Sequence, residues 1–155
     1  MLFRSIFLAL LVVAIIIVIR YRSISLVFPI LFTNIIEITI LLAILGGFGV
    51  LDLSAMAGVI ALIGTGVDNQ IIITDEMLKK KTGEQEQSTK QKMEKAFFIV
   101  FTTAGIALAS MLPLFLSGIV EVMGFALATM LGVIIGVAVT RPAYGAIIEL
   151  IGIKH

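Results

Sequence analysis

Two acidic residues, Asp68 and Glu37, lie inside long apolar stretches of this sequence and are the residues best suited to chemistry. Asp68 follows the apolar stretch Ala61–Val67, and Glu37 lies within residues 24–49. A carboxylate at the centre of a membrane helix costs roughly 2.5–3.5 kcal/mol on insertion scales, so a chain rarely keeps one without a use. Asp68 is therefore a candidate proton carrier, a candidate cation ligand, or a hydrogen-bonding structural acid.

The neighbours of Asp68 favour proton chemistry over cation binding. A preformed cation site needs several oxygen ligands, and no second carboxylate lies within one helical turn of Asp68. Thr65, together with Thr102 or Thr103, is a candidate hydroxyl partner. Asp75 lies seven residues further on the same helix face. It is a candidate exit for a proton relay, and a solvated helix end is the alternative interpretation.

Glu37 admits two interpretations that the sequence supports equally. Asn34 precedes it by one turn on the same face, so Glu37 is a candidate second residue of a proton path. Alternatively Glu37 bonds a hydroxyl of another helix, an interaction that contributes modestly. Arg141, which precedes Pro142 at the end of the last apolar stretch, is expected to extend to the membrane interface.

Other kinds of site have no support in the sequence. There is no cysteine, and His155, the only histidine, is the last residue. Gly64-Thr65-Gly66 is not a phosphate loop, because no strand precedes it and no Lys-Ser/Thr pair follows it. No nucleophile–base pair, metal cluster or nucleotide motif is visible. We therefore expect neither an enzyme nor a bound metal or cofactor.

The composition indicates the elements that must hold these residues. The chain is 60% hydrophobic and only 14% charged, with a mean hydropathy of +1.20, which is typical of an integral membrane protein. The apolar runs are much longer than the roughly ten residues of a membrane strand and do not alternate. Helices are the remaining way to satisfy the backbone in lipid, so the sequence predicts an all-α membrane protein.

Five spans are predicted, within a single transmembrane domain of residues 1–155. Asp52-Leu53-Ser54 predicts a turn and a helix N-cap, so the second and third spans form a tight hairpin. Residues 78–95 form the predicted cytoplasmic loop, broken at Gly83, and its later part is either an interfacial amphipathic helix or solvated. The last span continues as helix through Ile151. The predicted spans are 5–19, 24–49, 53–77, 96–116 and 122–140.

Positive charge predicts the orientation of the chain in a plasma membrane. Alternating the spans leaves only Arg4 on one side. The positive-inside rule then places the C-terminus in the cytoplasm and the N-terminus outside, which suggests that a further span and an exterior domain precede this chain. The charges on the other side are Arg20, Arg22, the lysines of the 79–95 loop, Arg141 and Lys154.

Small residues predict a tightly packed five-helix bundle. Close packing of small side chains drives helix association in lipid. Gly64 and Gly66 permit close approach or bending in the third span, and a stripe that includes Ala57, Ala61 and Asp68 is expected to turn Asp68 inward. The fifth span carries small residues at four-residue spacing: Gly124, Ala128, Gly132, Gly136 and Thr140.

The stretch Gly64–Glu76 resembles the fourth transmembrane helix of the SecD/SecF family of protein-export membrane proteins, in its archaeal SecD form. The Gly-x-Gly-Val-Asp core recurs in the wider resistance-nodulation-division superfamily, and the following Asn-Gln-Ile-Ile-Ile-Thr-Asp-Glu is more specific. Gly124-Phe125-Ala126 and Thr140-Arg141 also fit, and the resemblance covers about Ser5 to Glu149.

This resemblance implies a fold, a function and partners. SecD has six membrane helices with an exterior domain after the first, so this chain corresponds to the last five helices, one half of a pseudo-symmetric membrane domain. The family pairs SecD with a SecF-like protein and assists translocation of polypeptides through the Sec channel, using the proton gradient. Its transmembrane aspartate corresponds to Asp68. The exterior domain that engages the polypeptide is absent from this sequence.

Three functions stay open at this point. The first is a proton-coupled accessory subunit for protein export. The second is half of a related proton-driven transporter of small molecules or lipids. The third is a scaffold without transport, in which Asp68 and Glu37 only join helices. A SecF-like partner favours the first over the second, and loss of gradient-driven activity in an Asp68→Asn variant argues against the third.

Overall fold

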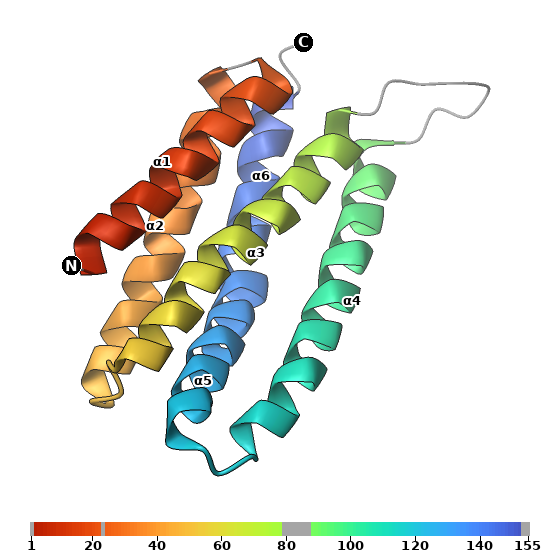
Figure 1. The fold of residues 1–155 in the computed structure, drawn as a ribbon. Helices are drawn as coiled ribbons and strands as arrows, with labels where there is room; N and C mark the ends of the chain where they lie inside the picture. The colour runs from red at the N-terminus through yellow and green to blue at the C-terminus, as the bar shows by residue number, and fades with distance from the viewer. Residues whose placement is uncertain (1, 23, 79–87, 153–155) are drawn as a thin grey trace.

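A computed structural model describes residues 2–22, 24–78 and 88–152 of the chain (Figure 1). Among them, five helical segments are long and apolar enough to cross a membrane, and no strand occurs. The prediction of an all-α membrane bundle is therefore confirmed. The elements are α1 (Leu2–Tyr21), α2 (Ile24–Gly47), α3 (Leu53–Leu78), α4 (Thr89–Phe115), α5 (Val120–Ile135), the π-helical turn η1 (Gly136–Thr140) and α6 (Arg141–Gly152).

Helix α4 begins at Thr89, inside the segment predicted to be a loop. The Gln91 side chain accepts a hydrogen bond of 3.1 Å from the Ser88 backbone N–H, which stabilises this helix start. The charged first turns therefore continue directly into the membrane span. The predicted break at Gly83 lies outside the described residues, as do Lys79–Lys81, Lys154 and His155.

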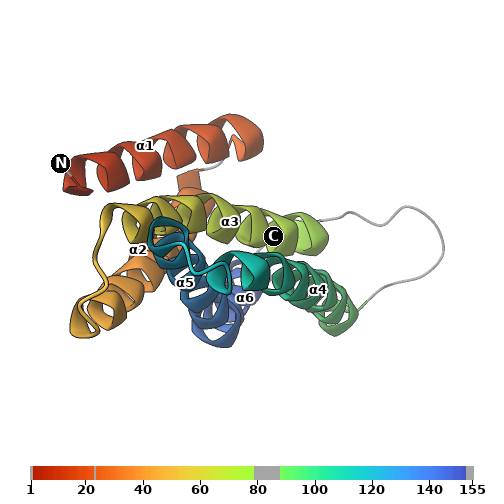
Figure 2. The same cartoon turned by 60° about the horizontal axis from the view of Figure 1, so that its bottom comes forward.

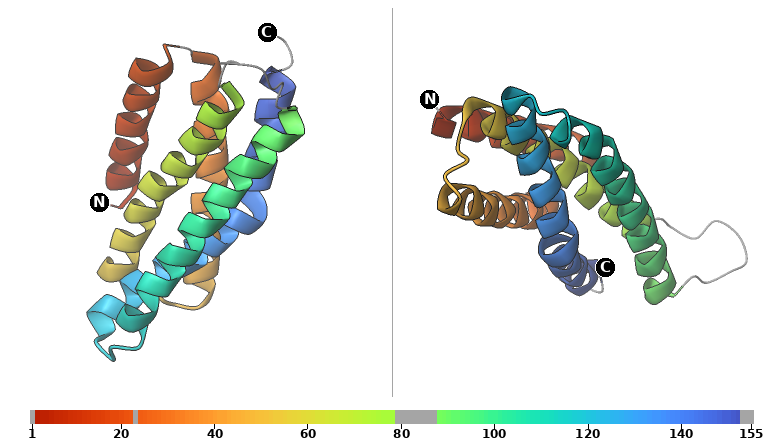
Figure 3. Two further views of the ribbon diagram at one scale, coloured as in Figure 1. Left: turned by 90° about the vertical axis from the view of Figure 1, so that its right-hand side faces the viewer. Right: turned by 90° about the horizontal axis from the view of Figure 1, so that it is seen from below.

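Helix α3 occupies the centre of the bundle and packs against each of the other five α-helices. Figure 2 shows α3 between α1 on one side and α4, α5 and α6 on the other. Figure 3 shows α1 at the rim of the bundle, where it packs mainly on α2 and α3. Residues of α3 are therefore close to every part of the membrane domain.

Glycines allow α3 and α5 to pack closely. A Cβ atom on Gly58 would lie 2.8 Å from the Phe125 carbonyl oxygen and 2.9 Å from the Ala128 Cβ, so only glycine fits there without movement. Similarly, Gly132 faces the side chain of Leu62. Because small residues let helix backbones approach in lipid, this contact accounts for much of the packing of the bundle.

Two apolar clusters fill the core, with a polar layer between them. The first is built around Leu41, Val59 and Ala128, and the second around Ile30 and Ile148. On α2 and on the segment formed by η1 and α6, buried polar residues lie between the two clusters. They are Thr33, Asn34 and Glu37 on α2, Thr140 at the end of η1 and Arg141 at the start of α6. Gln70 on α3 lies among residues of the second cluster and bonds to Thr33 and Asn34 of this layer.

The predicted hairpin between α2 and α3 is present and is closed by Asp52. One carboxylate oxygen of Asp52 accepts hydrogen bonds from the Ala55 N–H at 2.7 Å and the Ser54 hydroxyl at 2.9 Å. The bond from Ala55, followed by that from Ser54, lowers the pKa of the Asp52 carboxyl below its ordinary value. Gly49 adopts a φ of 68°, a left-handed conformation that suits glycine at a helix end.

Replacing Gly58 with alanine should destabilise the bundle by about 1–3 kcal/mol, because the new methyl group overlaps the α5 backbone. Gly64→Ala is the matched control, since nothing lies within 4 Å of a Cβ at that position. There the better helix propensity of alanine should stabilise the helix by up to about 1 kcal/mol. The measurement is the free energy of unfolding in a lipid bicelle. Equal effects of the two substitutions would contradict this packing.

Asp52→Asn should reduce the loss of stability in acid. A folded-state pKa below the unfolded value means that the contribution of Asp52 is complete above the unfolded pKa of about 3.9 and disappears as pH falls through the folded pKa. The midpoint of thermal unfolding, followed in detergent from pH 7 downward, should therefore fall less steeply in the variant. Glu121→Gln, which removes an exposed acid in the first turn of α5, is the control. Parallel curves for Asp52→Asn and the unmodified chain would refute the assignment.

Candidate functional site

Asp68 lies on the outer surface of α3 and is exposed. Within the described part of the chain it makes no hydrogen bond or ion pair. The expectation that Asp68 turns into the bundle is therefore wrong for this chain on its own. Both faces of α3 carry small residues, and α5 packs on the face of Gly58 and Leu62, which leaves the face of Gly64 and Asp68 outside.

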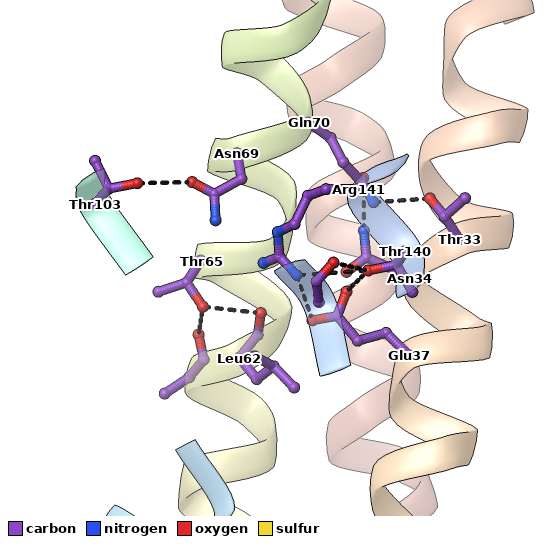
Figure 4. Close-up of polar contacts among 12 residues, drawn as sticks. Thr33, Asn34, Glu37, Leu62, Thr65, Asn69, Gln70, Thr103, Thr140 and Arg141 are labelled. Atoms are coloured by element: carbon purple, nitrogen blue, oxygen red, sulfur yellow. Dashed lines mark hydrogen bonds and ion pairs between the residues drawn. The ribbon is translucent and has the colours of Figure 1, made fainter. Parts of the chain in front are cut away.

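The threonines expected to support Asp68 bond elsewhere. Thr65 donates a hydrogen bond to the Leu62 carbonyl at 3.1 Å (Figure 4). Thr102 donates to the Phe98 carbonyl at 2.8 Å. Thr103 is 3.0 Å from the Val100 carbonyl and 3.5 Å from the Asn69 side-chain oxygen. Each hydroxyl is thus satisfied mainly by its own helix, an arrangement that is common for threonine inside helices.

Glu37 and Arg141 form an ion pair in the interior of the bundle. The Arg141 Nη1 lies 3.0 Å from the Glu37 Oε1, and each side chain is only 1% exposed. Thr140 donates a second hydrogen bond to the Glu37 Oε2 at 2.7 Å. Figure 4 shows the three side chains converging between α2 and the start of α6. The structure thus joins an acid from the second span to two residues near the end of the fifth.

The expectation that Arg141 reaches the membrane interface is wrong. Arg141 follows η1 directly and lies well inside a continuous helical span that runs from Val120 to Ile151. Gly136 provides the necessary space, because a Cβ atom on that residue would overlap the Arg141 Nη1. The signal in the sequence was an intramembrane acid without an assigned partner and a glycine five residues before an arginine.

Further buried polar residues extend from this ion pair through α3. Asn34 Nδ2 donates to Gln70 Oε1 at 2.9 Å, and Gln70 Nε2 donates to Thr33 Oγ1 at 2.7 Å. Towards the C-terminal end of α3, the hydroxyls of Thr74 and Tyr144 lie 2.5 Å apart. Sequence analysis did not identify Gln70, Thr74 or Tyr144 as members of the polar layer, because side-chain amides and hydroxyls are ordinary in membrane helices.

Asp75 connects α3 to α1 at the membrane edge. Its carboxylate lies 2.6 Å from the Arg20 guanidinium and accepts a hydrogen bond of 2.6 Å from the Tyr21 hydroxyl. The Arg20 and Asp75 side chains are 52% and 38% exposed, so this pair is a surface contact. Arg20 and Tyr21, at the C-terminal end of α1, therefore attach that helix to α3.

The predicted packing residues have different surroundings. Gly66 lies close to α2, where a Cβ atom would be 2.8 Å from the Asn34 Oδ1. In contrast, Gly64 is exposed and has open space around it. The five small residues of the fifth span that were singled out for their spacing are all buried: Gly124, Ala128, Gly132, Gly136 and Thr140.

An apolar cavity of about 360 Å³ lies between α4 and the segment formed by α5 and η1. Its walls include Phe101, Leu108, Val133 and Val137, and no charged residue contributes to them. The cavity is separate from both intramembrane acids. Within the described residues, no group of three acidic or histidine side chains is placed to hold a metal ion. Asp68 and the pair of Glu37 with Arg141 are the candidate functional residues of the described part of the chain.

Arg141→Met should lower the free energy of unfolding by about 3–5 kcal/mol, because it leaves the Glu37 charge buried without a partner. The double variant Glu37→Leu/Arg141→Met should regain most of that loss, since Thr140 retains a bond of 3.1 Å to the Gly136 carbonyl. The exposed pair of Arg20 with Asp75 provides the control, and Arg20→Met should cost much less stability than Arg141→Met, because solvent screens an exposed ion pair. Unfolding in bicelles measures all three. A double variant as unstable as Arg141→Met would contradict a coupled pair.

Comparison with known proteins agrees with this architecture. The family model of the C-terminal part of protein export membrane protein SecD/SecF matches residues 2–148. The protein-export membrane protein SecD of Methanocaldococcus jannaschii is 47% identical over 150 residues, covering 94% of this chain and 36% of that relative. The protein of the same name from Methanothermobacter thermautotrophicus is 49% identical over 154 residues, covering 92% of this chain and 37% of the relative.

No solved structure matches this chain. The chain spans little more than a third of the length of these two relatives. The matched region nevertheless includes α1 to α5, η1 and most of α6, together with both intramembrane acids and Arg141. The chain therefore belongs to the SecD/SecF family of protein-export membrane proteins, of which it contains the C-terminal membrane part.

Proposed function

We propose that this chain is the membrane domain of an accessory subunit of the Sec protein-export machinery, and that Asp68 carries protons through the membrane to assist export. The expected partners are a SecF-like membrane protein, the Sec channel and the translocating polypeptide. In the whole protein an exterior domain would engage that polypeptide. Membership of the SecD/SecF family supports the role in export.

The outward position of Asp68 is the single observation that carries the proposal for its role. A carboxylate facing lipid near the middle of a helix is costly, so this surface is suited to contact with another membrane protein. Gly64 and Thr65 lie on the same exposed face of α3. Small and weakly polar side chains of this kind are typical of helix–helix interfaces in membranes.

The adjacent surface of α4 has the same character. In the most apolar stretch of α4, only 11% of the residues are buried, against 50% in the corresponding stretch of α3. Thr102, Gly105 and Ser110 are exposed along it, interspersed with Phe98 and other large apolar side chains. A SecF-like partner that covers α3 and α4 would enclose Asp68 between two membrane domains, where access of protons from either side can be controlled.

The two intramembrane acids differ in what surrounds them. Glu37 already has a cation and a hydroxyl bonded to it inside the bundle. Asp68 makes no such bonds within the described residues and lies on the surface proposed for the partner. We therefore assign the proton-carrying role to Asp68 and a structural role to Glu37. Asp75, bonded to Arg20 and Tyr21, is assigned to the attachment of α1.

The proposed orientation follows from the arrangement of charge. The C-terminal end of α1, whose last turn contains Arg20, and the start of α4 lie at the same end of the bundle as the C-terminal end of α6 (Figure 1). The positive-inside rule assigns this end to the cytoplasm. The beginning of α1 then lies towards the exterior of the plasma membrane, and protons that assist export would move from that side to the cytoplasmic end.

Asp68→Asn should abolish the gradient-dependent part of protein export while the folded bundle persists. An amide can still form hydrogen bonds with a partner, but it cannot take up and release a proton as a carboxylic acid does. The measurement is translocation of a secreted polypeptide into membrane vesicles that contain the whole protein, its SecF-like partner and the channel. It is made with and without an imposed proton gradient. Thermal unfolding checks that the variant is folded.

Glu121→Gln is the matched control, since it neutralises an exposed acid at the end of the bundle away from the proposed cytoplasmic side. It should retain the response to the gradient. If Asp68→Asn also retains it, the aspartate only joins helices and the proposal for its role is wrong. If the gradient instead drives a lipid or small molecule with export unaffected, the chain belongs to a transporter.

A further inference from the structure

The contacts described above involve only the Nη1 atom of the Arg141 guanidinium group. Its Nη1 faces Glu37 at 3.0 Å and Thr140 at 3.4 Å. Its Nε and Nη2 are buried and have no hydrogen-bond partner in the described part of the chain. Figure 4 shows these two nitrogens on the side of the group that points away from Glu37 and towards α3.

These two nitrogens form one edge of the guanidinium plane. Their N–H groups point in parallel, which is the geometry that binds a pair of oxygen atoms side by side. Buried donors in native proteins are almost always bonded to protein or to ordered water. A buried arginine edge without a protein partner therefore indicates a ligand that presents oxygen.

The charge balance decides which oxygen ligand fits. Glu37 already compensates the charge of Arg141, and both side chains lie between two apolar clusters. A second anion would leave an uncompensated negative charge in this interior, which is strongly unfavourable. Asp68, the nearest other acid along α3, faces the outside of the bundle. A neutral oxygen ligand is thus favoured, and water is the common one in protein interiors.

The surroundings offer the further partners that a buried water requires. The Cβ position of Gly66 lies 2.8 Å from the Asn34 Oδ1 and 3.7 Å from the Glu37 Oε2, so both oxygens border the same part of α3. The Asn34 Oδ1 accepts none of the hydrogen bonds found among the described residues, because Asn34 bonds through its Nδ2. A buried water usually makes two to four hydrogen bonds, and this set of groups is sufficient.

We propose that the Nε–Nη2 edge of Arg141 binds ordered water in a closed polar site between α2, α3 and α6, with Asn34 as the accepting side chain. The site lies within the bundle, whereas Asp68 lies on its surface. It therefore does not depend on the role proposed for Asp68. Tyr144, one turn further along α6, is fully buried and bonded to Thr74.

The test is nuclear magnetic resonance of the whole chain in lipid nanodiscs with ¹⁵N-labelled arginine. The Arg141 Nε–H should receive magnetisation directly from water. It should also exchange with deuterated solvent at least about tenfold more slowly than the Arg20 Nε–H, because the bound water is confined and its release requires local opening. Arg141→Lys assigns the signal. If that variant does not fold, Arg4→Lys, Arg20→Lys and Arg22→Lys assign it by elimination.

A second variant tests the accepting side chain. Asn34→Leu should weaken the transfer from water to the Arg141 Nε–H by removing one partner of the bound water. Ser110→Ala is the control, because that hydroxyl is exposed on α4 and bonded to the Ala107 carbonyl at 2.9 Å, and it should leave the transfer unchanged. Equal transfer in both variants would exclude Asn34 from the site.

Two results would overturn the proposal. A persistent Arg141 Nε–H signal that receives no magnetisation from water would show that the edge is dry. An Nε–H that exchanges as fast as that of Arg20, or is lost to exchange entirely, would show that bulk solvent reaches Arg141 and that no closed site exists. Neither result depends on the export activity of the protein, so the inference can fail while the proposed function holds.

Discussion

The ion pair between Arg141 and Glu37 is the interaction on which the interior of this bundle depends. An arginine between two apolar clusters is stable only if its charge is compensated and its nitrogens are bonded. The chain meets this requirement by continuing as helix through η1, which brings Arg141 opposite α2, and by having Gly136 where any side chain would collide with the guanidinium. Thr140, adjacent to the arginine, bonds the second oxygen of Glu37.

The two intramembrane acids of the chain have opposite environments, and the proposed function rests on this difference. Glu37 is buried, and Arg141 of the same polypeptide compensates its charge, so it contributes to the structure of the bundle. Asp68 lies on the surface of α3, where no described residue forms an ion pair with it. A membrane domain with such a surface is suited to act together with a second one, and the proposed proton transfer then takes place at the boundary between two proteins.

Helix α3 permits close approach of other helices on either side because small residues occur on both of its faces. Gly58 and Gly66 allow α5 and α2 to approach from one side. On the opposite side, next to Asp68, the small residues Gly64 and Thr65 leave a surface that is weakly polar and allows close approach. Since lipid does not drive apolar faces together, closeness of approach decides which helices associate. The central helix therefore determines the packing of the bundle and also presents the candidate functional residue on its outer surface.

The sequence alone determined that the chain is helical and crosses the membrane, because lipid permits few other ways to satisfy a long apolar backbone. It also indicated the hairpin at Asp52, which depends on neighbouring residues, and the resemblance carried by Gly64–Glu76. Only the tertiary structure decided which face of α3 is buried, since helical periodicity defines faces but not their neighbours. It also decided the partner of Glu37, because Arg141 is 104 residues away and its depth depends on the continuation of the helix through η1.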